Sequence, residues 1–409
     1  MLKLPSSGEI KQFFPNHRIE LVKNFLLLLS CIYKSRSVNL NICKRYAPDV
    51  LGKKKMSLSN VYTRFIRFFK MDNISSFCLG ISLLILEHLE SVQENSYVIL
   101  DRTNWELGGT KINVLQVGLG LFNYSFVPLL GVPLADKKGN SNQKERIGLL
   151  NLLLRLCPFL PSSSIVIGDR EFIGRNWFSQ ILGKGLSFVF RVRKMDYLEQ
   201  IASSVGLNIP QLHRRIKKQV GSHGFYFQSF EMNGNTYFYL VFKNKKATKG
   251  TDPYIRLVSN KKEAKVILQA YTYRWEIEVY FKKVKTDGFN LEDLNLTESD
   301  KIFLMVSIVG YLYTLAFLQG VEQQKKKPQK MQYFINRKKE YKRVSFFQQG
   351  LDSLAQVFFK LKDCIRLIHQ KIAKKKVRDF RILKEFKDFN IIENLKIITF
   401  DFPLKMESV

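Results

Sequence analysis

The chain has 409 residues, of which 45% are hydrophobic and 13% aromatic, so it is long enough for two or three domains with buried cores. Lysine and arginine outnumber aspartate and glutamate by 66 to 35, and the resulting formal charge of +31 predicts a polyanionic partner, usually nucleic acid. The apolar run FLLLLSCIY at residues 25–33, taken here as the longest, is too short to cross a bilayer, which argues against a membrane protein and a signal peptide.

The five cysteines, at positions 31, 43, 78, 157 and 364, are scattered along the chain without a CxxC pair or a histidine at ligand spacing. This pattern favours a reducing compartment and excludes a recognisable zinc site. Any catalytic metal is therefore expected on carboxylates, which favours Mg²⁺ or Mn²⁺ as hard cations.

The periodicity of apolar residues changes near residue 97. Residues 1 to about 92 have the pattern of helices, whereas the β-branched run SYVIL predicts a strand that ends on Asp101. Two further strands are predicted at 112–122 and 124–134, joined by a hairpin at Asn123.

A helix through residue 157 is predicted next, with Asn142 and Glu145 placed as a capping box. The apolar run from Ile165 to Ile167 then predicts a fourth strand, with Asp169 just past its end. This order of three strands, helix, strand and helix predicts an α/β fold with a ribonuclease H-like core, a mixed sheet with flanking helices in which strands one and four are neighbours.

Asp101 and Asp169 are therefore expected to be close in space although they lie 68 residues apart. A single aspartate after a strand is usually a turn residue. Two such aspartates on neighbouring strands of a strongly basic protein are better explained by a shared divalent metal.

The segment YTYRWEIEVYFKKVK, residues 271–285, has no Gly or Pro and predicts one continuous helix. Tyr271, Arg274, Glu278 and Lys285 fall within about 60° of one another on it, while Glu276 points almost the opposite way. Considered alone, this stripe is equally compatible with an exposed face steadied by ion pairs.

Several motifs together resemble the DDE transposases of the insertion-sequence-four family, which includes the transposon-five enzyme. LDRTNW at 100–105 and GDREF at 168–172 are similar to its two aspartate motifs, and the pattern Y-x2-R-x3-E-x6-K begins at Tyr271. YKRVSFFQQGLD at 341–352 resembles the usual ending of the family, and LSNVYTRFIRFFK in the N-terminal part is a weaker likeness.

The resemblance implies that Asp101, Asp169 and Glu278 are the catalytic triad and hold two divalent ions, Mg²⁺ or Mn²⁺. Three carboxylates suit in-line displacement at a phosphodiester, which two metal ions promote. The remaining residues of the stripe, Tyr271, Arg274 and Lys285, would then contact the phosphates beside the scissile bond.

Other carboxylates receive no metal role. Glu276 should face solvent or another element, Glu171 is expected to start the next helix, and Asp136 lies in a polar turn. Among the tryptophans, Trp105 is expected to support the first aspartate and Trp275 to pack into the core.

The chain between Asp169 and Glu278 is too long for a minimal core. Four β-like stretches occur there, FVFRVR, FYFQSFEM, NTYFYLVF and PYIRLV, and the dipeptide Asn233-Gly234 predicts a hairpin. In the resembled family such an insertion helps to hold a DNA hairpin or a flipped base. Each single aromatic residue of these stretches is better explained as part of a small sheet core.

These interpretations divide the chain into five segments. We expect a helical DNA-binding region, the first part of the ribonuclease H-like core, a β-rich insertion, the second part of the core, and a helical basic region for synapsis or dimerisation. Their predicted ranges are 1–95, 96–187, 188–262, 263–322 and 323–409, in chain order. The basic runs at 325–330, 336–343 and 371–378 are compatible with DNA contact, dimerisation or solvated helix faces.

The predicted function is that of a DNA transposase that cuts and pastes its own insertion sequence. Its expected partners are double-stranded DNA, as terminal inverted repeats and target, and a second copy of the chain in a synaptic homodimer, in the cytoplasm of a bacterium at the nucleoid. Two alternatives stay open: a related metal-dependent DNA nuclease, and an inactive relic that only binds DNA.

Overall fold

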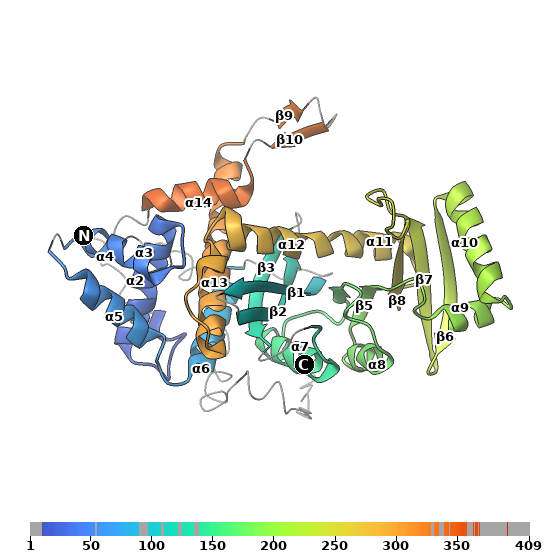
Figure 1. Cartoon of the computed structure of the whole chain (residues 1–409), viewed down its shortest axis with the longest axis horizontal. Helices are drawn as coiled ribbons and strands as arrows, with labels where there is room; N and C mark the ends of the chain where they lie inside the picture. The colour runs from blue at the N-terminus through green and yellow to red at the C-terminus, as the bar shows by residue number, and fades with distance from the viewer. Residues whose placement is uncertain are drawn as a thin grey trace.

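A single mixed sheet of eight strands forms the centre of the molecule (Figure 1). The structure is a computed structural model that describes residues 10–53, 55–89, 97–107, 110–121, 125–134, 139–328, 331–334, 339–342 and 344–357, with residues 363, 365, 366, 368 and 391. The strand order is β3-β2-β1-β4-β5-β8-β7-β6. The strands are β1 (Tyr97–Leu107), β2 (Thr110–Leu121), β3 (Ser125–Pro133), β4 (Ile165–Gly168), β5 (Ser187–Arg191), β6 (Phe225–Met232), β7 (Asn235–Lys243) and β8 (Tyr254–Ser259).

The first five strands of this order confirm the predicted ribonuclease H-like core. β1 pairs antiparallel with β2, β2 antiparallel with β3, and β1 parallel with β4, so strands one and four are neighbours. The predicted capping box is also present, because Asn142 accepts from the backbone N–H of Glu145 at 2.9 Å and Glu145 accepts from that of Asn142 at 2.6 Å. It begins α7 (Gln143–Leu156).

β1 is longer than predicted and does not end on Asp101. It pairs with β2 along its whole length, from Tyr97 opposite Gly120 to Leu107 opposite Thr110. Pairing with β4 covers only Tyr97 to Ile99. Asp101 therefore lies inside a strand, two residues beyond the point where the parallel neighbour stops pairing.

Helices cover both faces of the core sheet. α7 and α8 (Arg175–Gly183) lie below it in Figure 1, and α11 (Ala264–Thr272) and α12 (Arg274–Lys282) run above it along β5, β4 and β1. α13 (Ser299–Lys326) and α6 (Ile74–Glu87) pack against β3 at one end.

The N-terminal region is helical where it is described, as predicted. Its helices are α2 (Ile19–Ser35), α3 (Leu40–Cys43), η1 (Lys44–Tyr46), α4 (Ala47–Leu51), α5 (Leu58–Phe68) and α6. The apolar run at 25–33 is buried within α2. The Tyr33 hydroxyl donates to the carbonyl of Leu312 at 2.6 Å, which ties α2 to α13.

The sequence interpretation overlooked a longer apolar segment. α13 is long and apolar enough to cross a membrane, with a mean hydropathy of 1.9 in its most apolar window. That window is 83% buried inside the structure, against α6, β3 and α14 (Phe346–Val357). One such helix is weak evidence for a membrane span, since a buried core helix has the same length and composition.

The segment predicted as a β-rich insertion continues the core sheet. FVFRVR contributes β5, which spans the predicted boundary at residue 188 and pairs with both β4 and β8. β6 and β7 form the predicted hairpin, with Asn233 and Gly234 both at positive φ, 53° and 71°. Two unexpected helices, α9 (Leu198–Ser204) and α10 (Ile209–His223), pack on β6.

The C-terminal region, predicted to be helical, also contains a two-stranded hairpin of β9 (Met331–Phe334) and β10 (Lys339–Lys342). α14 follows and crosses α13 very closely. A Cβ atom on Gly350 would lie 1.7 Å from the carbonyl oxygen of Ala316, so only glycine permits this approach. The predicted basic run at 371–378 lies outside the described residues.

Burial of His17 predicts an acid-sensitive fold. Desolvation and then the charge of Lys11 lower the pKa of His17 from 6.5 to about 4, and its Nε2 has no hydrogen-bond partner within the described part of the chain. The unfolded chain binds a proton that the folded chain rejects between these values, so the free energy of unfolding should fall as the pH decreases through this range.

We expect His17→Leu to remove that part of the acid sensitivity. The melting temperature of the wild type should fall relative to that of the variant as the pH decreases to 4.5. The two melting temperatures should converge above pH 7. Melting temperatures that fall in parallel for both proteins would contradict the assignment.

Candidate active site

Asp101 and Asp169 lie at matching positions on neighbouring parallel strands. β1 and β4 pair with an offset of 68 residues, from Tyr97 to Ile165 and from Ile99 to Ile167. Asp169 follows Asp101 by the same 68 residues, so the register, continued past Ile99, brings the two aspartates opposite each other. Adjacent strands are about 4.8 Å apart. The predicted proximity of the two carboxylates is thus present in the fold.

The Asp101 carboxylate is largely removed from water, with 18% of its side chain exposed. Its Oδ1 accepts from the backbone N–H of Arg102 at 2.8 Å. Burial raises the pKa of Asp101 to about 6, and the nearby carboxylates of Asp169 and Glu278 add to that effect. A carboxylate close to two other carboxylates favours the binding of a cation.

Asp169 lies directly after β4, and basic side chains approach it. Nη1 of Arg191, on β5, lies 3.9 Å from its Oδ1, and Nε of Arg170 lies at the same distance. That Oδ1 is buried and accepts no hydrogen bond from the described residues. An unsatisfied buried carboxylate oxygen has lone pairs available for a ligand.

α12 brings the third carboxylate to the same place through Arg274. One Nη of Arg274 lies 3.7 Å from Asp101, and the other donates to Glu278 Oε1. Its guanidinium also lies 5.7 Å from the centre of the Tyr271 ring. Burial lowers the pKa of Arg274, but Tyr271 and the three carboxylates raise it above its ordinary value.

The predicted single helix over 271–285 is divided in the structure. α11 ends at Thr272 and α12 starts at Arg274, and the last residues form a π-helical turn, η2 (Lys283–Asp287). Tyr271, Arg274 and Glu278 stay together. Lys285, seven residues beyond Glu278, is about 10 Å further along the helix axis and reaches Asn104 of β1.

At that position Lys285 has its own set of partners. Its Nζ donates to the backbone carbonyl of Asn104 at 2.6 Å, lies 3.3 Å from Glu292, and lies 5.6 Å from the centre of the Trp105 ring. Trp105 is buried and lies beside Lys285, and its support of Asp101 stays a prediction. The four residues of the predicted stripe thus form a cluster of three and one separate lysine.

Comparison with known proteins identifies the family of the chain. Residues 94–315, more than half of the chain, match the family described as Transposase DDE domain. The chain belongs to this family. It is also similar to a chain in a cryo-EM structure of a piggyBac transposase synaptic complex with hairpin DNA, at 11% identity and a TM-score of 0.46, covering 95% of this chain and 78% of that one. No curated protein matches the chain.

Glu171 in this DDE domain does not start a helix, contrary to prediction. α8 starts four residues later, at Arg175, and Glu171 instead accepts from Ser141, at 2.9 Å from its backbone N–H and 2.6 Å from its hydroxyl. Its other oxygen accepts from Arg102 Nε at 3.0 Å. Arg102 follows Asp101 and Glu171 lies two residues after Asp169, so this buried ion pair braces the two aspartates.

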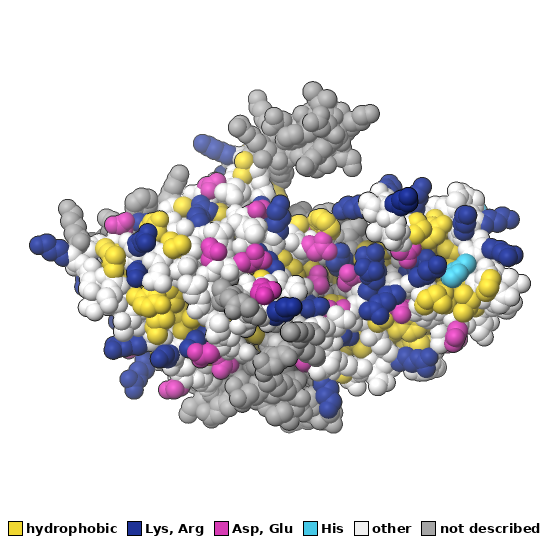
Figure 2. All heavy atoms as spheres, in the orientation of Figure 1, with side chains coloured by type: hydrophobic (Ala, Val, Ile, Leu, Met, Phe, Trp, Pro, Cys, Tyr) yellow, Lys and Arg dark blue, Asp and Glu magenta, His cyan; other side chains and the backbone are white. Residues whose placement is uncertain are grey.

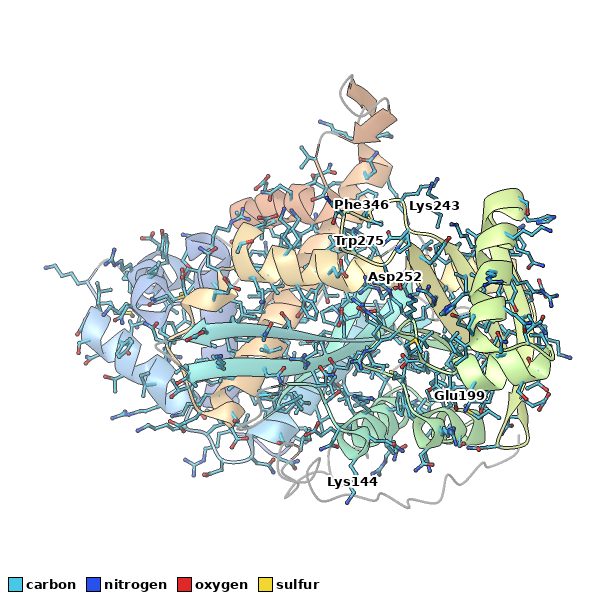
Figure 3. All side chains as sticks on the ribbon, turned by 45° about the vertical axis from the view of Figure 1, so that its right-hand side comes forward. Lys144, Glu199, Lys243, Asp252, Trp275 and Phe346 are labelled. Carbon is cyan, nitrogen blue, oxygen red and sulfur yellow. The ribbon has the colours of Figure 1, made fainter. Side chains whose placement is uncertain are left out.

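Glu276 faces another element, one of its two predicted surroundings, whereas Trp275 differs from its prediction. Glu276 is half-buried and its charge acts on Tyr313 of α13, and burial raises the pKa of Glu276 to about 7. Trp275 is 50% exposed instead of packing into the core, and Lys246 Nζ lies 3.9 Å from the centre of its ring. Figure 3 shows Trp275 on the same side as Lys243 and Asp252, which flank the loop that carries Lys246.

The sequence interpretation missed Arg191, Arg102 and Glu171 as neighbours of the aspartates. Arg191 had a usable signal, since it interrupts the apolar run FVFRVR on a strand next to β4. The Arg102–Glu171 pair had none, because only the fold brings the two motifs together.

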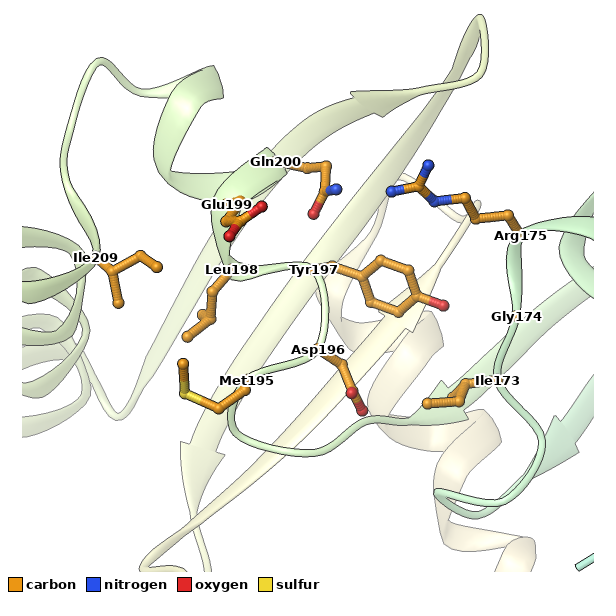
Figure 4. A pocket seen from close by; sticks show the side chains of 10 residues that line it. All are labelled: Ile173, Gly174, Arg175, Met195, Asp196, Tyr197, Leu198, Glu199, Gln200 and Ile209. Carbon is orange, nitrogen blue, oxygen red and sulfur yellow. The ribbon is translucent and has the colours of Figure 1, made fainter.

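A cavity of about 450 Å³ lies apart from these residues, between the core and the segment that carries α9 and α10 (Figure 4). Its walls include Arg175, Tyr197 and Gln200. None of the six predicted site residues lines it. The candidate active site is therefore the carboxylate cluster rather than this cavity.

The donor atoms of the cluster fit a divalent metal, although their present arrangement is not a preformed metal site. Three carboxylates supply the oxygen ligands that Mg²⁺ and Mn²⁺ prefer. No group of three histidine, cysteine, aspartate or glutamate side chains among the described residues is grouped closely enough to hold an ion as it stands. The Arg274 guanidinium lies between Asp101 and Glu278.

We expect the brace between Arg102 and Glu171 to be required for stability. Glu171→Gln leaves the Arg102 cation, which is 18% exposed, without its carboxylate, and truncating one partner of a buried pair is strongly destabilising. Arg102→Gln/Glu171→Gln should lose less than the sum of the two single changes, because Arg102 is then no longer left as a cation without its carboxylate.

Chemical denaturation of the four proteins measures this coupling. Glu199→Gln, at an exposed carboxylate, serves as the control and should leave the denaturation midpoint unchanged. Strict additivity of the two single substitutions would show that the pair does not act as a brace.

Proposed function

We propose that the chain is a DNA transposase of the insertion-sequence-four type, which cleaves DNA at the ends of its own element and joins them to a target. The observation that carries the proposal is the shared offset of 68 residues, which brings Asp101 and Asp169 opposite each other beside Glu278. Membership of the Transposase DDE domain family supports the reaction class.

Asp101, Asp169 and Glu278 would hold two Mg²⁺ or Mn²⁺ ions. Such ions, when bound, activate the attacking oxygen and stabilise the leaving oxygen of an in-line displacement. The Oδ1 of Asp169 accepts no hydrogen bond from the described residues, so its lone pairs suit this role. Burial and the nearby carboxylates raise the pKa of Asp101, which a bound cation would offset.

Arg274 has two tasks in this proposal. Its contacts with Asp101 and Glu278 hold the helix carboxylate beside the strand carboxylate. Its planar guanidinium also suits bidentate contact with a DNA phosphate, which then competes with the carboxylates for it. The Tyr271 ring packs beside the guanidinium of Arg274. Lys285 contacts a phosphate further along β1.

The proposed partners are the terminal inverted repeats of the element and its target, both as duplex DNA. The formal charge of +31 supports a polyanion of this kind. The proposed location is the cytoplasm of a bacterial cell, at the nucleoid.

Glu278→Gln tests the assignment of the third carboxylate. It keeps the shape of the side chain and removes the charge that would hold a divalent ion, so Mg²⁺-dependent cleavage of DNA that carries the flanking ends of its own gene should fall by several orders of magnitude. Binding of the same DNA should survive or tighten, since a carboxylate near the scissile phosphate repels it.

Glu276→Gln is the matched control on the same helix. Among the described residues, Arg274 forms an ion pair with Glu278 and none with Glu276, so cleavage by Glu276→Gln should remain within a few-fold of the wild type. Loss of cleavage in the control but not in Glu278→Gln would overturn the triad. Single cuts without end joining would favour the nuclease alternative, and binding without any cleavage by the wild type would favour the inactive relic.

Joining two element ends requires both in one complex, so we expect a dimer of the chain on paired DNA ends. Analytical ultracentrifugation of the wild type with end-containing DNA in Ca²⁺ should give two protein chains and two DNA molecules per complex. A stable complex of one chain with two ends would contradict this expectation.

A further inference from the structure

A dense basic surface outside the candidate active site lies on α10. Arg214, Arg215, Lys217 and Lys218 are all exposed there. The chain has no aspartate or glutamate from residue 200 to residue 230. Figure 2 shows dark blue side chains at the end of the molecule where α10 lies. We call these four residues the α10 basic face.

The α10 basic face is opposite the side of the helix that packs on the protein. At 100° per residue, its four cations span about 160° and centre about 180° from the stripe of Leu212, Ile216 and Val220. That apolar stripe is buried, and α10 packs on β6 and β7. The cations therefore point away from the sheet.

The protein does not balance these charges itself. Within the described residues, no carboxylate lies within ion-pair distance of any of the four cations, whereas Lys283 and Lys301 elsewhere pair with Asp287 and Glu298. Arg214 also lies three residues before Lys217 and four before Lys218. Like charges at these spacings destabilise a helix.

Basic residues on neighbouring segments also lie close to α10. The pKa of His213, on the same helix, is lowered by partial burial and then by the charges of Lys194 and Arg256. A helix that stays folded despite this repulsion is suited to an external polyanion.

We propose that the α10 basic face binds the phosphate backbone of duplex DNA, at a distance from the carboxylate cluster. This inference rests on the proposed function, which supplies duplex DNA as the partner. Four cations within about 6 Å of helix length match the closely spaced phosphates of a duplex, and none of them needs to contact a base.

An anionic membrane is a poorer fit for the same helix. Basic helices that bind membranes insert an apolar face below the headgroups. The apolar face of α10 is already buried against β6 and β7. α10 lies at the end of the molecule opposite the N-terminal helices, with α12 between them (Figure 1). A duplex held at α10 would extend the contact with DNA beyond the site of cleavage.

The test is the salt dependence of binding to a duplex of arbitrary sequence, about 30 base pairs long, since backbone contacts are independent of sequence. The full-length wild type is compared with Arg214→Gln/Arg215→Gln, with Lys217→Gln/Lys218→Gln and with the quadruple variant. Each double substitution should reduce the slope of log K against log salt by about 1.8 and weaken binding about tenfold or more at 0.1 M salt.

Lys34→Gln/Lys301→Gln is the matched control, because it removes the same charge from two lysines that pair with Asp49 and Glu298. It should leave the salt slope unchanged. The melting temperature of the quadruple variant should equal or exceed that of the wild type, because repulsion within α10 is relieved. This separates weaker DNA binding from damage to the fold.

Equal affinity and slope for the quadruple variant and the wild type would overturn the proposal, as would an equal loss in the control. Loss of binding to phosphatidylserine vesicles without loss of duplex binding would assign the helix to a membrane instead. If the wild type cleaves DNA with Mg²⁺ while the quadruple variant binds normally, the proposed function stands and the α10 proposal fails. If the quadruple variant binds the duplex more weakly but the wild type does not cleave DNA, the α10 proposal stands and the proposed function fails.

Discussion

The parallel pairing of β1 with β4 is the constraint on which the candidate active site depends. Three residue pairs, from Tyr97–Ile165 to Ile99–Ile167, fix the offset between the strands. Because side chains alternate across a sheet, a slip of one residue would send one aspartate to the opposite face. The pairing stops just before the aspartates, while β1 continues alongside β2. Asp101 therefore has a rigid backbone and an open side towards Asp169.

Charge balance then organises what surrounds this strand pair. Arg274 links Asp101 to Glu278, Arg191 approaches Asp169, and the Arg102–Glu171 pair joins the two aspartate motifs from the side. Carboxylates with this little exposure are costly unless cations accompany them. The same arrangement leaves an oxygen of Asp169 without a hydrogen bond and the pKa of Asp101 raised to about 6. A site that is only partly neutralised by its own arginines is one that a divalent ion and a phosphate can complete together.

The extension of the sheet gives the molecule a second basic region. β8, β7 and β6 continue the core sheet without a break, so α10 is carried on the same framework as the carboxylates. A rigid connection of this kind fixes the position of one DNA contact relative to the other. The exposed Trp275 beneath Lys246 adds a further point where this extension touches α12.

The sequence by itself determined the core and its candidate residues. The starts of β1 and β4, the capping box at Asn142 and the choice of Asp101 and Asp169 as candidates follow from local patterns of period and turn chemistry, which act over a few residues. The spacing of Tyr271, Arg274 and Glu278 likewise follows from helical geometry, and these three residues do cluster. α10 was overlooked although its sequence carries local helix signals, a capping box of Asn208 and Gln211 and a proline near its start.

Only the tertiary structure decided the rest. β1 extends past Asp101 because β2 pairs with it. Lys285 lies two turns beyond Glu278 and contacts Asn104 and Trp105 of β1. Glu171 is an ion-pair partner rather than a helix start because Arg102, 69 residues away, lies beside it. These last outcomes depend on contacts between distant segments, and no local pattern encodes such contacts.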